Sequence, residues 1–180
     1  MVHRRLRVWS AAVAFCTVIS AGASSAEPVK NVVLVHGAWA DGSSWSEVIP
    51  LLQAEGMHVS SVQNPLTSLA GAVAETRRTL ELQDGPAVLV GHSWSGTLVS
   101  EVGANPKVTA LVYVAARAPD AGEDFVALSA KFPTAPARAA NGVAREKAKV
   151  LYAVQEPTAA SLFGNRTTVA AWHSPDRPFE

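Results

Sequence analysis

Four short apolar runs without polar alternation constrain the fold of this chain most strongly. An apolar run of this length is typical of a strand buried on both faces of a parallel sheet. Segments with helical spacing and loops rich in Gly and Pro separate the runs. This alternation of strand and helix over about 85 residues predicts an α/β fold with a doubly wound, mostly parallel sheet. The expected strands cover residues 31–35, 58–62, 87–91 and 108–115.

Three helices are predicted between these strands. Each combines apolar residues at helical spacing with a Gly, Asn or Pro signal at its end. They begin at Trp45, Leu69 and about Trp94, and they end before Gly56, Asp84 and Asn105. Beyond residue 116 the chain is rich in Ala and Pro, and only residues 123–131 and 143–155 have a helical pattern.

The first 26 residues are predicted to be a signal peptide. Arg4, Arg5 and Arg7 precede an apolar stretch of 16 residues, and small residues lead to a cleavage site before Glu27. The alternative, a membrane anchor, is disfavoured because about 20 residues are needed to span a bilayer. We therefore expect an exported protein, periplasmic or extracellular, with no stable membrane association after cleavage.

Charge and cysteine content exclude several classes of protein. The chain has 15 basic and 15 acidic residues, so it lacks the basic excess of a nucleic-acid binder, and we expect no nucleic-acid partner. Its single cysteine, Cys16, lies in the predicted leader, which excludes a disulfide or thiolate site in the processed form. No histidine pair has metal-ligand spacing, so we expect no metal, and the lack of a Gly-rich phosphate loop argues against the other common functions of doubly wound folds.

The segment Gly91-His92-Ser93-Trp94-Ser95-Gly96 carries the predicted chemistry. A serine on a sharp turn between strand and helix is held with its Oγ above the sheet, where it can act as a nucleophile. The turn requires small residues around the serine, and we assign this role to Gly91, Ser95 and Gly96. Ser95 stands where glycine is usual, and Gly96 is expected to relieve crowding in the turn.

A second segment, His36-Gly37-Ala38-Trp39, closes the first strand. In folds of this type the loop lies beside the nucleophile, so its backbone can stabilise an oxyanion. We predict that the amides of Ala38 and Trp94 form the oxyanion hole. For Trp39 and Trp94 the sequence leaves open whether the side chains line an acyl pocket or pack in the core, whereas Trp45 is expected in the core.

Together with Leu111-Val112-Tyr113-Val114-Ala115-Ala116, these segments resemble the α/β-hydrolase superfamily, within it the small esterases related to plant methylesterases and hydroxynitrile lyases. The resemblance covers about residues 29–120. It implies hydrolysis of small carboxylic esters by Ser93, no cofactor and a helical cap. It divides residues 27–180 into a core at 29–118, a cap at about 119–166 and an end segment at 167–180. Cyanohydrin-cleaving lyase chemistry is an alternative within the same group.

The family's catalytic Asp and His follow the serine in that order, and no clear match to either is found here. Only 87 residues follow Ser93, so the chain is expected to be a C-terminally truncated hydrolase with poor turnover. His173 and Asp176 are late candidates in the wrong order, and a solvated tail is the simpler interpretation; His92 is expected to be structural. A non-catalytic remnant or ligand-binding module is therefore the alternative function. The last strand would then leave an exposed edge, through which we expect self-association.

Overall fold

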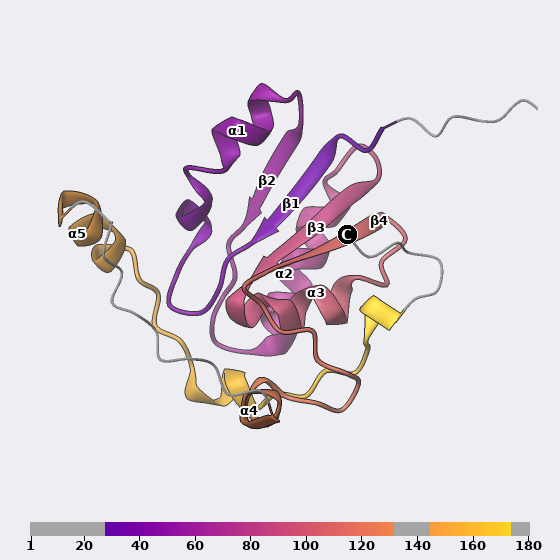
Figure 1. The fold of residues 1–180 in the computed structure, drawn as a ribbon, viewed down its shortest axis with the longest axis vertical. Helices are drawn as coiled ribbons and strands as arrows, with labels where there is room; N and C mark the ends of the chain where they lie inside the picture. Colours follow the sequence, from indigo (N-terminus) through magenta and orange to yellow (C-terminus); the bar gives the residue numbers. More distant parts are fainter. Residues whose placement is uncertain (1–27, 132–144, 174–180) are drawn as a thin grey trace, which may run out of the picture.

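The structure, a computed structural model, describes residues 28–131 and 145–173. Four parallel strands form one sheet in the order β2-β1-β3-β4, so the first and third strands are central (Figure 1). Their bounds confirm the predicted strands to within one residue, and the first two agree at both ends. The strands are β1 (Asn31–Val35), β2 (His58–Val62), β3 (Ala87–His92) and β4 (Val108–Val114).

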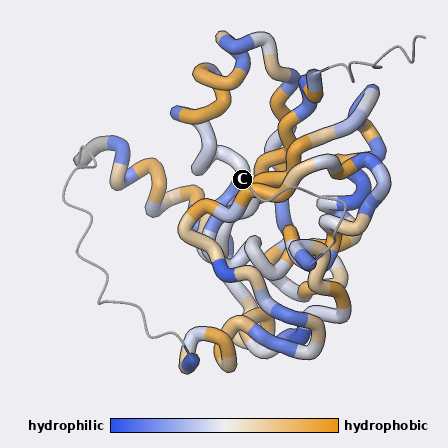
Figure 2. Tube along the Cα trace, turned by 45° about the vertical axis from the view of Figure 1, so that its right-hand side comes forward, coloured by the Kyte–Doolittle hydropathy of each residue, from blue (hydrophilic) through white to orange (hydrophobic). Residues whose placement is uncertain are grey.

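Helices cover both faces of this sheet, which confirms the doubly wound α/β fold. Successive residues of β1 point to opposite faces. Val33 and Val35 pack in the cluster that contains residues of α2 (Leu69–Glu81) and α3 (Gly96–Val102). Val32 and Leu34 pack instead with Trp45 and with α1 (Ile49–Ala54). In Figure 2 the hydrophobic colour follows the central strands.

The first and third predicted helices are each divided in the structure. A 3-10 turn, η1 (Gly42–Trp45), is capped by the Asp41 carboxylate, and α1 begins only at Ile49. Pro50 occupies the first turn of α1, the part of a helix that tolerates a residue without an N–H. The third helix likewise opens with a 3-10 turn, η2 (Ser93–Ser95), and α3 ends at Val102.

Among the described residues, the chain beyond β4 forms short elements outside the sheet, and the division into cap and end segment stays a prediction. The elements are α4 (Phe125–Lys131), α5 (Arg145–Ala153), η3 (Ala160–Gly164) and η4 (Ala171–His173). Figure 1 shows the segment from η3 to η4 returning along α3. There the Glu101 carboxylate accepts hydrogen bonds from the backbone N–H groups of Thr168 and Val169, at 2.7 and 3.2 Å.

Two predictions concern residues beyond the described ranges. The signal peptide at 1–26 and the candidate Asp176 both fall outside them. Within the described ranges, no helix has the length and apolar character needed to cross a membrane.

Candidate active site

Ser93 lies at the junction of β3 and η2 with a left-handed backbone, at φ +56°. The residue is partly exposed. Such a φ is unfavourable for a residue other than glycine, so the surrounding packing must hold it. The turn around Ser93 is tightly packed at Gly91. A Cβ atom there would lie 2.5 Å from Val99 Cγ2 and 2.8 Å from the carbonyl oxygen of Ser95. The turn therefore requires glycine at position 91.

The structure explains the residue types at positions 95 and 96 by contacts that the sequence alone did not indicate. Ser95 is fully buried, and its Oγ donates a hydrogen bond to the carbonyl oxygen of His36, which ties the serine turn to the loop after β1. A Cβ atom on Gly96 would overlap the carbonyl oxygen of Arg117, in the segment after β4. Gly96 is thus required by a neighbouring backbone, a reason that the sequence did not indicate, and its role in relieving crowding within the turn stays a prediction.

The loop after β1 passes directly beside Ser93. A Cβ atom placed on Gly37 would lie 3.1 Å from the Cβ of Ser93. Neither the amide of Ala38 nor that of Trp94 donates a hydrogen bond to any group of the described residues. Two backbone donors that remain free near a partly exposed hydroxyl are suited to hold a developing negative charge.

Backbone strain gathers at this end of the sheet. Among the described residues, left-handed φ values at positions other than glycine occur at Trp39 (+56°), Ser93 (+56°) and Ala115 (+44°). They follow β1, β3 and β4, whose carboxyl ends lie at one edge of the parallel sheet. In open α/β sheets this edge is where ligands bind, and strained residues cluster at functional sites.

Buried His36 fixes the path of the loop after β1. Its Nδ1 lies 2.9 Å from the carbonyl oxygen of Gly37 and must donate, while its Nε2 accepts from the backbone N–H of Asn64 at 2.9 Å. Both bonds together require the neutral imidazole. Burial also lowers the pKa of His36 below 6.5. His36 is therefore a neutral structural residue, and its bond to Asn64 spans 28 positions that no local pattern could predict.

Acidification is expected to destabilise the fold through His36. Because its pKa is lowered in the folded state, the unfolded chain takes up a proton first. The stabilisation is therefore complete above about pH 6.5, and it falls by about 1.4 kcal/mol per pH unit below, until the folded protein is protonated too. Urea unfolding between about pH 7 and about pH 5 should show a steeper loss for the wild type than for His36→Gln. Parallel pH profiles would contradict this role.

Ser93 Oγ makes no hydrogen bond with any group of the described residues. His92 is exposed, and its ring lies perpendicular to the Trp45 ring with centroids 6.3 Å apart. His173 pairs instead with Asp120, at 2.6 Å between Nε2 and Oδ1. Both side chains of this contact are exposed. The sequence did not indicate the contact because the partners are 53 positions apart.

His173 and the serine turn also lie at opposite ends of α3. The adjacent Ala171 packs at the far end of α3, where a Cβ atom on Gly103 would lie 2.9 Å from the Cβ of Ala171. Ser93 lies before the start of the same helix.

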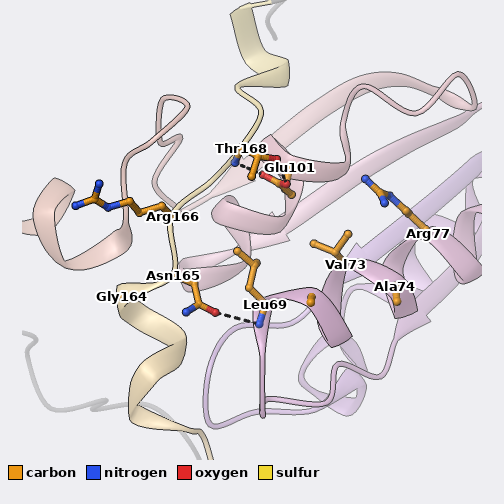
Figure 3. Close-up of a pocket in the computed structure, with 10 residues that line it drawn as sticks. Leu69, Val73, Ala74, Arg77, Glu101, Gly164, Asn165, Arg166 and Thr168 are labelled. Carbon is orange, nitrogen blue, oxygen red and sulfur yellow. Dashed lines mark hydrogen bonds between the residues drawn. The ribbon is translucent and has the colours of Figure 1, made fainter.

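A cavity of about 720 Å³ lies between α2 and the segment from η3 to η4 (Figure 3). At its border, Asn165 Oδ1 accepts a hydrogen bond from the backbone N–H of Leu69 at 3.3 Å. None of the residues lining this cavity belongs to the serine turn or to the loop after β1.

The tryptophans take different places. Trp94 is fully buried in the core, as is most of Trp45, whereas Trp39 is 56% exposed and lines a cleft. Of the two side chains left open by the sequence, only Trp39 can therefore contact a ligand. Its backbone N–H donates to Thr158 Oγ1 at 2.9 Å, which joins the loop after β1 to the cap across 119 positions.

Comparison with known families agrees with this architecture. The model of the alpha/beta hydrolase family matches residues 32–179. The chain belongs to this family. A curated relative, the carbendazim hydrolyzing esterase of Nocardioides sp. (strain SG-4G), is 32% identical over 117 residues, 56% of this chain and 48% of that protein. This α/β-hydrolase chain thus spans about half the length of the curated relative it matches.

Solved structures share the α/β-hydrolase fold. An extracellular alpha/beta-hydrolase from a Paenibacillus species, which shares structural and functional homology to tobacco salicylic acid binding protein 2, is similar with a TM-score of 0.67 and 19% identity, over 85% of this chain and 76% of that one. Polyneuridine aldehyde esterase is similar with a TM-score of 0.51 and 24% identity, over 59% of this chain and 49% of that one. These likenesses confirm the predicted fold class.

Proposed function

We propose that this α/β-hydrolase cleaves small carboxylic esters, with Ser93 as the nucleophile and the amides of Ala38 and Trp94 as the oxyanion hole. The observation that carries the proposal is the left-handed, partly exposed Ser93 beside two amides without other partners among the described residues. Ser93 Oγ attacks the ester carbonyl carbon, and the carbonyl oxygen gains the negative charge that the two N–H groups receive. The alcohol leaves with a proton, and water then releases the acid.

Weak activation of Ser93 belongs to the same proposal. Because no imidazole of the described residues forms a hydrogen bond with its Oγ, we expect the serine to keep its proton and to attack slowly. In serine enzymes that lose a member of the catalytic triad, a residual acceleration of about 10³- to 10⁴-fold over water remains, from the oxyanion hole and substrate binding. We therefore expect the 180-residue chain to turn over slowly.

A fluorophosphonate probe tests the nucleophile directly. We expect slow, stoichiometric labelling of the purified protein, measured by intact mass. The labelling rate of Ser93→Ala should be lower by about 10³-fold or more. The exposed Ser46 offers a matched control, and Ser46→Ala should be labelled at the wild-type rate. Absence of labelling in the wild type would overturn the proposal and favour the non-catalytic alternative. Cyanide release from a cyanohydrin without ester hydrolysis would favour lyase chemistry.

We further propose that a second copy of the chain associates along the edge of β4. Within the described residues β4 pairs only with β3, and its sequence VTALVYV has no charged residue to protect the free edge. Sedimentation at rising concentration should detect dimers. Val114→Lys should weaken the association about tenfold, because an edge lysine opposes strand addition. Val48→Lys, at a similarly exposed site in the turn before α1, should not weaken it. A monomer at every concentration would contradict this.

A further inference from the structure

An apolar cleft of about 530 Å³ lies between the loop after β1 and the cap. Trp39 forms one wall, Phe125 and Val126 of α4 form another, and Phe163 of η3 lies between them. Two of these side chains are unusually uncovered for apolar groups, with Trp39 56% and Val126 57% exposed. The volume lies within the range of about 300–1,000 Å³ that is usual for small-molecule sites. We call this site the aromatic cleft.

Three rings form a continuous wall in the aromatic cleft. The Phe163 ring is 5.2 Å from the Trp39 ring and 5.6 Å from the Phe125 ring, measured between centroids, and both pairs are tilted. At these separations aromatic rings make favourable edge and offset contacts. A further flat ring can extend this arrangement, whereas a saturated group of equal size gains only from burial.

The two hydroxyl groups that line the aromatic cleft already form hydrogen bonds with the backbone. Thr158 Oγ1 accepts from the N–H of Trp39 at 2.9 Å, and Ser129 Oγ donates to the carbonyl oxygen of Phe125 at 2.7 Å. No charged side chain belongs to its described lining. The nearest charge shown at its wall is the Arg117 guanidinium, 5.5 Å from the centroid of the Phe125 ring. The lining itself therefore suits a neutral group.

The aromatic cleft also lies within reach of Ser93. Gly37 is beside the Cβ of Ser93, and Trp39 follows two residues later. Two residues span at most about 7 Å, so a substrate attacked by Ser93 can extend past Ala38 into the cleft. We infer that the aromatic cleft binds a flat aromatic group of the ester, an inference that rests on the proposed function for the identity of the bound molecule.

Binding to Ser93→Ala protein tests this without turnover. By calorimetry, methyl naphthylacetate should bind about tenfold more tightly than methyl decalinylacetate, its saturated counterpart of similar shape. Val126→Asp should weaken binding of the naphthyl ester about tenfold, because it places a charge in the cleft. The exposed side chain of Val126 allows this change without disturbing the core. Val150→Asp is the matched control, since Val150 is 61% exposed on α5 and lies outside the cleft lining, and it should leave binding unchanged.

The outcomes separate this inference from the proposed function. Equal affinity for the two esters, or equal effects of the two aspartate variants, would overturn the assignment of the cleft even if Ser93 is labelled. Selective naphthyl binding together with no labelling of Ser93 would retain the cleft as a binding site and overturn the hydrolase mechanism.

Discussion

Gly96→Ala is expected to destabilise the protein by about 3 kcal/mol or more, or to prevent folding, because overpacking against backbone is costly. A methyl group on Gly96 would overlap the carbonyl oxygen of Arg117 and lie 3.0 Å from the Cβ of Ala116. These atoms follow β4, so relief would require the segment leaving the sheet to move away from α3. Urea unfolding monitored by circular dichroism measures the loss.

Gly164→Ala provides the matched control for this prediction. Gly164 lies in η3, has no left-handed φ, and an added Cβ there would meet nothing within 4 Å. Its alanine variant should therefore unfold within about 0.5 kcal/mol of the wild type. Equal stability of the two variants would show that the approach of Arg117 to Gly96 is looser than described.

Trp94→Ala is expected to cost about 3–5 kcal/mol, the usual loss when a large buried ring leaves a cavity. Trp94 is fully buried and packs with Leu98, Val99 and the strands in the core beneath α2 and α3. Its indole Nε1 has no hydrogen-bond partner among the described residues. Trp94→Phe should therefore cost less, because it keeps most of the ring and removes an unpaired buried N–H.

Trp39 and Trp94, the two tryptophans whose placement the sequence left open, allow a direct comparison of stability. Trp39→Ala should change stability by less than about 1 kcal/mol, because more than half of the Trp39 side chain is exposed. Thermal and urea unfolding of the two alanine variants measure the contrast. A larger loss at Trp39 than at Trp94 would contradict the placement of Trp94 in the core.

The fold was largely predictable because its signals are local. Parallel strands buried on both faces appear as unbroken apolar runs, and β1 and β2 have the predicted ends. Helix α2 begins at Leu69 as predicted, after Ser68, whose side chain accepts from the N–H of Gly71. The first helix was predicted too long because the apolar spacing continues through residues that Pro50 excludes from an α-helix.

The candidate site was predictable only in part, because its supporting contacts are distant in sequence. The serine turn and the loop after β1 are short motifs, so their residues could be named. The hydrogen bonds from Ser95 to His36 and from Trp39 to Thr158 depend on how the chain packs. The partners cannot be predicted from the residue types alone. The cap is therefore the region in which sequence patterns were least informative about what lies beside Ser93.

The left-handed residues after β1, β3 and β4 have a consequence for thermal stability. Each departure from the preferred backbone region costs about 1–3 kcal/mol, and glycine would reduce that cost at Trp39, Ser93 or Ala115. Such replacements would raise heat tolerance while loosening the geometry at the sheet's carboxyl edge. With side chains at these three places, the chain accepts a stability cost at the edge of the sheet where Ser93 lies, the kind of cost that a stability–activity trade-off predicts.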